Sequence, residues 1–155
     1  MNAGTIDQRL RRIEDRTAII DTVVAYAVAI DDGDWQRFAS LLTDPVHVDF
    51  SAAGLPAADF PRDRFTGFAA QALDAWDARQ HLSPNHRVVF DETDPDRAVC
   101  HSYMYAQHYK DGALYVMRGS YDNHMTRTPD GWRISRLVQH ISWLEGDPNA
   151  AAPAA

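Results

Sequence analysis

Residues Tyr26–Trp35, with the sequence YAVAIDDGDW, join the end of a long amphipathic helix to the start of a second element. Between Thr5 and Ala29, apolar residues recur near the helical period, and the threonine can cap the first turn. Gly33 is expected to end this helix, because glycine readily adopts the left-handed conformation found just after helix termini. Asp34 can then cap a short second helix that continues through Leu42.

The remainder of the chain changes from helical to strand-like patterns. A short strand is predicted at residues 46–50, a proline- and glycine-containing loop at 51–61 and a third helix from Arg64 to Arg79. After this helix, alternating polar and apolar residues predict four antiparallel strands, at residues 86–90, 98–109, 114–126 and 132–144. The pair Asp111-Gly112 is a strong signal for a tight hairpin turn between the middle two.

Helices followed by long hairpinned strands predict an α+β fold, in which a curved antiparallel or mixed sheet wraps around three N-terminal helices. A length of 155 residues suits one domain with a single core, which we expect over residues 1–149. Residues 150–155 form an alanine-rich tail that is expected to be disordered.

The composition excludes several classes of function. A net charge of −7, without an extended basic cluster, argues against nucleic acid and anionic membranes as partners. A single cysteine, Cys100, excludes an intramolecular disulfide framework and suits a reducing compartment. No apolar run suggests a signal peptide or a membrane span, so a cytoplasmic location is expected.

Asp31 is the first candidate functional residue. A carboxylate at a helix C-terminus is electrostatically unfavourable, because the helix dipole already places partial negative charge there. Asp32 and Asp34 are explained as exposed turn and capping residues, whereas Asp31 can share an inward face with Tyr26. The two readings are a solvated surface residue and a charge directed into a pocket, and we favour the pocket.

Two histidines, His81 and His108, are the expected partners of this carboxylate. His81 lies among polar residues, so it can also be a plain strand-entry residue. The strand containing His108 has small or flexible residues on the same face, as a concave pocket wall requires: Cys100, Ser102, Met104 and Ala106. Its other face is rich in tyrosine, which suits an interface.

Metal and cofactor chemistry have weak support. His47 and Asp49 share a strand face, but two ligands without a third are poor grounds for a metal site. An iron site built from Asp31, His81 and His108 is conceivable, yet an acid–base pair explains the same residues without metal. No feature lowers the pKa of Cys100 for nucleophilic work. Because the sequence also has no glycine-rich phosphate loop, no metal and no cofactor are expected.

Four motifs carry a resemblance to a known family, namely Ile30–Trp35, Val48–Phe50, Gln80–Leu82 and Gly131–Ile134. Across residues 10–145 the chain resembles the SnoaL-like branch of the nuclear transport factor 2-like superfamily. This branch includes scytalone dehydratase, hexachlorocyclohexane dehydrochlorinase and bile acid dehydratases. The resemblance implies a cone-shaped α+β barrel.

The resemblance also implies roles for individual residues. In these enzymes, an aspartate matching Asp31 and a histidine matching His81 form a dyad, and a histidine matching His108 lies across the pocket in scytalone dehydratase. A carboxylate bound to one imidazole nitrogen fixes the tautomer and leaves the other nitrogen as a base. Scytalone dehydratase also uses two tyrosines to hold a water against the substrate carbonyl. Here the matching residues are Ile30 and Phe50, which cannot donate a hydrogen bond.

The sequence therefore predicts a cofactor-independent lyase of the dehydratase or dehydrohalogenase type. His81, oriented by Asp31, is the expected base, and His108 or Tyr26 the expected donor to the developing charge or the leaving group. Tyr26, Tyr121 or Asn123 can replace the missing tyrosines. An apolar lining, much of which can equally be plain core, favours a small, largely hydrophobic cyclic or polyketide-like substrate, and its candidates are Val24, Phe38, Phe50, Phe68, Trp76 and Met104.

Two other functional classes remain open. An isomerase or polyketide cyclase would use the same pair of residues without losing a leaving group. A non-catalytic ligand-binding or assembly module would need neither histidine. In each case the tyrosine-rich face predicts a homo-oligomer formed through the sheet, with Tyr103, Tyr105, Tyr109 and Tyr115 in the interface.

Overall fold

The structure is a computed structural model that describes residues 5–151. Three α-helices and a short 3₁₀-helix are α1 Ile6–Asp32, α2 Trp35–Ser40, α3 Arg62–Leu73 and η1 Ser51–Ala53. The strands are β1 Leu42–Asp49, β2 Ala58–Phe60, β3 Ala78–Leu82, β4 Arg87–Phe90, β5 Arg97–Lys110, β6 Ala113–Thr128 and β7 Gly131–Gly146. The predicted α+β class is confirmed. Of the tail expected at 150–155, residues 152–155 lie outside the described residues.

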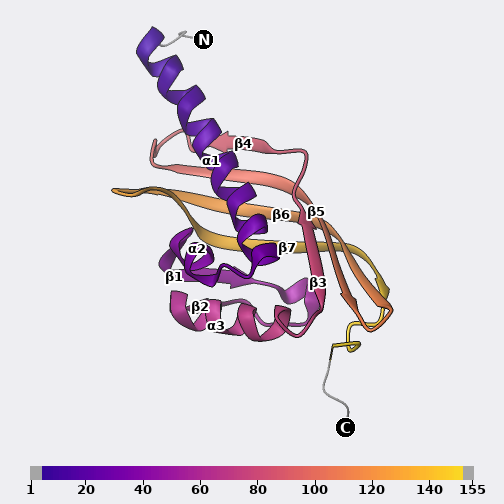
Figure 1. The fold of residues 1–155 in the computed structure, drawn as a ribbon. Coiled ribbons are helices and arrows are strands. Elements are labelled where there is room, and N and C mark those ends of the chain that lie inside the picture. The colour runs from indigo at the N-terminus through magenta and orange to yellow at the C-terminus, as the bar shows by residue number, and fades with distance from the viewer. Residues whose placement is uncertain (1–4, 152–155) are drawn as a thin grey trace.

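One strongly curved sheet forms most of the molecule, with the strand order β2-β1-β7-β6-β5-β3 (Figure 1). Only the β1–β7 pair is parallel among the strand pairs of residues 5–151. Strand β5 pairs with β6 along one edge. Its other edge is long enough to pair with two strands, β4 at one end and β3 at the other. This division places β3 beside the second half of β5, where His108 lies.

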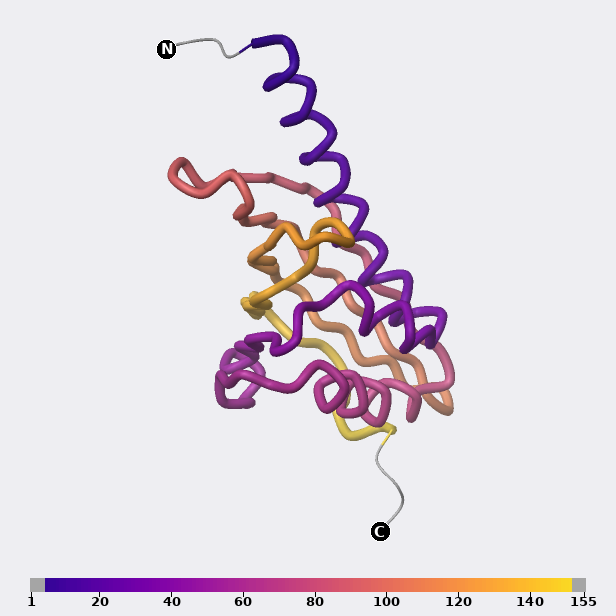
Figure 2. Tube along the Cα trace, turned by 90° about the vertical axis from the view of Figure 1, so that its left-hand side faces the viewer, coloured from indigo at the N-terminus to yellow at the C-terminus, as the bar shows by residue number. Residues whose placement is uncertain are grey.

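Helix α1 crosses the concave side of the sheet, and its inner face supplies part of the core. Ile19, Val23 and Ile30 are almost fully buried and pack in one cluster with residues of β1 and β7. The first turns of α1 stand clear of the sheet (Figure 2), and large apolar residues there, including Leu10 and Ile13, are exposed. The C-terminal half of α1 is therefore the part that the sheet surrounds.

The junction between α1 and α2 follows the sequence prediction. Gly33 has a left-handed conformation with φ of 68°, and its N–H donates to the carbonyl of Ile30. The carboxylate of Asp34 accepts a hydrogen bond from the backbone N–H of Arg37, so it caps α2. This junction fixes Asp31 on the last turn of α1.

Three predicted element boundaries are wrong. The helix expected from Arg64 to Arg79 ends at Leu73, and residues 78–82 form strand β3 instead. Pairing with β5 provides the backbone hydrogen bonds of this segment, and such pairing overrides local propensity. The expected loop 51–61 contains η1 and the strand β2, and Leu42 begins β1 rather than ending α2.

None of the helices described within residues 5–151 combines the length and the apolar character needed to cross a membrane.

Candidate functional site

Asp31 and His81 form a hydrogen-bonded pair between the end of α1 and strand β3. The Nδ1 atom of His81 lies 2.7 Å from one carboxylate oxygen of Asp31, and the backbone N–H of His81 donates to the other oxygen at 2.9 Å. With both oxygens engaged, the carboxylate is held in one orientation. Because an ionised carboxylate can only accept a hydrogen bond, the Nδ1 atom of His81 carries the donated hydrogen and the Nε2 atom carries the free lone pair.

Arg79 explains how an acidic residue is tolerated at this helix end. Its guanidinium donates to the carbonyl of Ile30 at 2.6 Å and to the carbonyl of Leu73 at 2.9 Å, and it pairs with Asp74 at 3.0 Å. It therefore binds the C-terminal carbonyls of both α1 and α3, where a cation offsets the partial negative charge of the helix dipole. Arg79 is two residues before His81 on β3, so it also fixes the distance between the two members of the pair.

His108 lies beside His81 and is buried. The two imidazole rings meet edge to face with 5.3 Å between their centres, and Trp76 and Tyr115 pack around the His108 ring. Neither ring nitrogen of His108 has a hydrogen-bond partner among residues 5–151. Burial, and secondarily the nearby His81, lowers the pKa of His108 to about 4. The imidazole is therefore neutral near pH 7, with one nitrogen able to donate a hydrogen bond and the other able to accept one.

Two tyrosines and a glutamine add further polar groups to the site. The side-chain nitrogen of Gln139 donates to the hydroxyl of Tyr121 at 2.9 Å and lies 3.4 Å from the sulfur of Met104. Since a thioether can only accept, this contact fixes the orientation of the amide. The hydroxyl hydrogen of Tyr121 is then free to donate elsewhere. The Gln139 carbonyl oxygen has no partner within the described part of the chain.

Both tyrosine hydroxyls remain protonated. Burial raises the pKa of Tyr121 to about 12 and that of Tyr26 well above its usual value. They can therefore act as hydrogen-bond donors over the whole physiological pH range.

These groups line a cavity of about 210 Å³ between α1, α3 and the sheet. Its polar lining residues are Tyr26, His81, His108, Tyr121 and Gln139. The remaining lining is apolar and comes mainly from α3 and from the segment 50–55 around η1, including Phe50, Leu55, Phe65 and Phe68. A pocket with a few convergent polar groups in an apolar wall is typical of small-molecule sites.

The structure brings together only part of the predicted set. Tyr26, His81, His108, Phe50, Phe68 and Tyr121 line the cavity, and Asp31 is joined to it through His81. Three predicted residues do not line it. Trp76 packs behind His108, Met104 lies beneath Gln139, and Asn123 donates to the carbonyl of Cys100 at 3.3 Å.

Two further candidates for the apolar lining also lie elsewhere. Val24 is 42% exposed on the outer side of α1, and Phe38 is fully buried in the core. Tyr115 likewise does not belong to the outer sheet face. It pairs directly with His108 across β5 and β6, and cross-strand partners project to the same side of a sheet.

Gln139 was missed by the sequence analysis, although a signal was present. It lies two residues after Leu137 on β7, and alternation places both side chains on the buried face. A polar residue on a buried face requires a partner or a function.

The other candidate chemistries have structural explanations. His47 pairs with Asp59 at 2.7 Å, while Asp49 accepts hydrogen bonds from Ser51, so His47 and Asp49 do not form a ligand pair. Burial raises the pKa of Cys100 to about 11, which disfavours the thiolate. No group of three potential metal ligands occurs among the side chains of residues 5–151.

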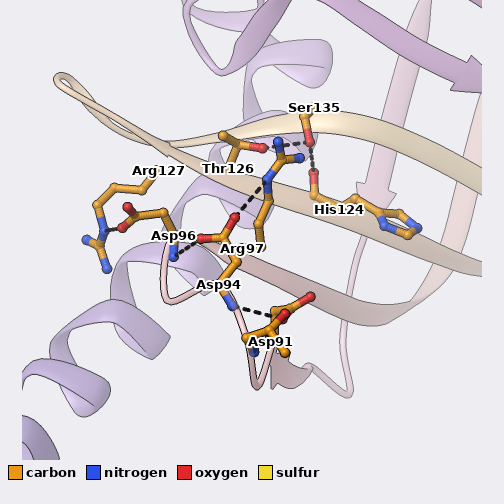
Figure 3. A network of polar contacts seen from close by, with 9 residues as sticks. Asp91, Asp94, Asp96, Arg97, His124, Thr126, Arg127 and Ser135 are labelled. Carbon is orange, nitrogen blue, oxygen red and sulfur yellow. Dashed lines mark hydrogen bonds and ion pairs between the residues drawn. The ribbon is translucent and has the colours of Figure 1, made fainter.

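The acidic turn between β4 and β5 is also structural. Asp91 and Asp94 accept hydrogen bonds from backbone N–H groups of the same turn, and Asp96 pairs with Arg127 at 2.8 Å (Figure 3). Although a wide depression of about 610 Å³ adjoins this turn, it does not include the Asp31–His81 pair. The polar groups of this turn are thus occupied in holding the hairpin.

Comparison with known proteins places this geometry in context. The family described as the SnoaL-like domain matches residues 11–138. The uncharacterised protein Rv2910c of Mycobacterium tuberculosis is 29% identical over 128 residues, which cover 82% of this chain and 85% of that protein.

Solved structures show the same fold. The Kfla4162 protein from Kribbella flavida superposes with a TM-score of 0.83 at 29% identity, covering 92% of this chain and 99% of that one. A type 2 hexachlorocyclohexane dehydrochlorinase, LinA, superposes with a TM-score of 0.77 at 18% identity, covering 89% and 92% of the two chains.

Proposed function

Since the chain belongs to the SnoaL-like family of the nuclear transport factor 2-like superfamily, we propose that it is a cofactor-independent lyase of the dehydratase type. One observation carries this proposal. The Asp31–His81 pair leaves one imidazole nitrogen free at a largely apolar cavity that also contains hydrogen-bond donors. LinA, which shares the fold, is named for an elimination reaction.

The proposed reaction begins at His81. Its Nε2 atom removes a proton from a carbon next to a carbonyl group, and Asp31 stabilises the imidazolium that results. The electrons of the broken C–H bond form a C=C bond as the bond to a neighbouring hydroxyl breaks. The His81 imidazolium returns its proton to the departing hydroxyl, so water leaves and the base is regenerated.

The developing negative charge on the carbonyl oxygen needs hydrogen-bond donors. The free hydroxyl hydrogen of Tyr121 is one donor, and the hydroxyl of Tyr26 is a second. A neutral His108 can supply an N–H in the same cavity, but its low pKa makes it a poor source of a full proton. Preorganised donors of this kind act strongly where water is excluded.

The cavity also indicates the substrate class. Its volume of about 210 Å³ and its mainly apolar wall suit a small, largely hydrophobic cyclic or polyketide-like molecule. We therefore propose hydroxylated cyclic ketones as the first compounds to test.

The main test compares turnover of these ketones by variants of two Asp–His pairs. His81→Ala and Asp31→Asn should each lower kcat by about 10²–10⁴-fold, the usual contribution of general acid–base catalysis. His101 and Asp122 form a similar pair on the outer face of the sheet, so His101→Ala and Asp122→Asn are matched controls expected to retain activity. Full activity in both members of the first pair would refute the proposal.

A second measurement separates the reaction classes. Mass spectrometry of the product should show loss of water, whereas an unchanged mass would indicate an isomerase or cyclase that uses the same pair. A ligand-binding module would instead give a tight ligand without turnover, whose affinity is unaffected by His81→Ala.

The pair itself can be tested without substrate. Nitrogen-15 NMR of the imidazole rings should show His81 protonated at Nδ1 in the wild type, because Nδ1–H donates a hydrogen bond to the carboxylate of Asp31. In Asp31→Ala both tautomers should appear. An Nε2–H tautomer in the wild type would contradict the assignment of His81 as the base.

A further inference from the structure

A second cavity of about 260 Å³ lies beside the first. We call it the distal chamber. Phe50, Leu55, Phe65 and Phe68 line both cavities, so the two cavities adjoin and share part of their wall. The distal chamber therefore continues the candidate site beyond the polar groups, toward β1 and β2.

The two cavities differ in their chemistry. The residues that line only the distal chamber are Val48, Pro56, Ala58 and Phe60, and every side chain around it is a hydrocarbon. No side chain there can orient a polar group. An apolar cavity of about 150 Å³ is enough to hold a benzene molecule, so the distal chamber has room for a ring or a short alkyl chain.

The boundary between the cavities has unusually exposed apolar groups. Leu55 is 41% exposed and Phe68 is 47% exposed, although both contribute to the walls of the two cavities. The rings of Phe50 and Phe60 each lie 6.2 Å from the ring of Phe65, forming a continuous aromatic wall from one cavity to the other. A ligand spanning both cavities would remove this surface from water, which is favourable in proportion to the area covered.

We propose that the distal chamber binds a hydrocarbon appendage of the substrate. The substrate is then an elongated molecule, with its reacting carbonyl end beside His81 and Tyr121 and an alkyl or aryl group in the distal chamber. The position of the reacting end rests on the proposed lyase function, whereas binding of the appendage rests only on the shape and chemistry of the chamber.

A homologous series of alkyl phenyl ketones, from acetophenone to hexanophenone, tests this proposal by isothermal titration calorimetry. The affinity of the wild type should rise about fourfold for each added methylene until the chamber is filled. Ala58→Leu narrows the chamber, so it should remove most of this gain while leaving acetophenone binding nearly unchanged. Ala57→Leu adds the same side chain at an exposed neighbour and should preserve the series.

Structural readouts exclude indirect effects. Thermal melting monitored by circular dichroism identifies a variant that fails to fold, and hexanophenone bound to the wild type provides an independent check. Its terminal methyl group should give nuclear Overhauser effects to the ring of Phe60. Effects confined to residues on the outer face of the sheet would overturn the proposal.

The experiments distinguish failure of the chamber proposal from failure of the proposed lyase function. His81→Ala should lose turnover but retain the dependence of affinity on chain length. A flat series in the wild type would overturn the chamber proposal whatever the activity. A changed oligomeric mass in Ala58→Leu with an unchanged ketone series would also overturn it, since the chamber would then contact a second copy of the chain.

Discussion

His108 is buried beside a second histidine, and this position should make the stability of the protein depend on pH. Its folded-state pKa of about 4 lies below the ordinary histidine value, because burial disfavours the charged ring. Between these two pKa values the unfolded chain binds a proton that the folded chain does not. The free energy of unfolding should therefore fall as pH decreases from about 6.5 to about 4, by about 3 kcal/mol from this residue.

The variant His108→Phe tests this prediction, because it keeps a ring between Trp76 and Tyr115 but cannot titrate. Urea unfolding at several pH values should show a smaller loss of stability between pH 6.5 and 4 than in the wild type. Burial also lowers the pKa of His86 and His124, so some slope will remain in the variant. Parallel curves for the two proteins would show that His108 is not a buried neutral base.

Residue-level features of the site were predictable from sequence to different extents. The unfavourable position of Asp31 at a helix end drew attention to it, but its functional role and its pairing with His81 came mainly from the family resemblance. Gln139 was not predicted, because its one sequence signal is that of a neutral polar residue on a buried strand face. The assignment of Tyr115 to the outer face was wrong, although the predicted Asp111-Gly112 turn already determines the register of the hairpin. That turn sets Lys110 opposite Ala113 and therefore His108 opposite Tyr115.

At the scale of elements, Arg79 is the residue that joins α1, α3 and β3. It donates to the last carbonyls of both helices while its own strand carries His81. In Arg79→Gln the two carbonyls lose a charged donor, and each such loss costs about 1–3 kcal/mol. We expect the free energy of unfolding to fall by about 3 kcal/mol, and kcat to fall as well because the turn carrying Asp31 is no longer held.

Chemical denaturation measures the first effect and a turnover assay the second. Arg37→Gln is the matched control, since Arg37 is an arginine exposed on α2. Equal stability of the two variants would show that Arg79 does not hold the helix ends together.

Elements with local signals were predicted well, and those that depend on distant pairing were not. The boundaries of α1 and the β5–β6 hairpin follow from a capping threonine, a left-handed glycine and a two-residue turn. The start of β3, Ala78 and Arg79, was predicted as the end of a helix because the helical apolar pattern runs as far as Trp76, and only pairing with β5, farther along the chain, makes these residues extended. The site depends on this non-local step, because β3 carries both Arg79 and His81.

At the scale of the whole molecule, the outer face of the sheet is the expected interface between copies of the chain. Tyr103 and Trp143 are 60% and 56% exposed there, and the Arg118 guanidinium stacks between the rings of Tyr105 and Trp143. These four residues form an outer aromatic patch. Tyrosine, tryptophan and arginine are the residues most enriched at energetically important interface positions.

Light scattering coupled to size-exclusion chromatography should therefore find a multiple of the 17.4 kDa chain mass. Trp143→Glu should weaken the assembly at least about 30-fold, because a central aromatic residue typically contributes 2 kcal/mol or more. The exposed apolar stripe at the start of α1 offers a competing surface, so Leu10→Glu is the informative comparison. A 17.4 kDa wild type, or dissociation by Leu10→Glu but not by Trp143→Glu, would contradict an interface at the outer aromatic patch.

Because this patch lies on the side of the sheet opposite the cavity, both variants should retain the Asp31–His81 pair. Activity in the dissociated form would show that one chain contains a complete site.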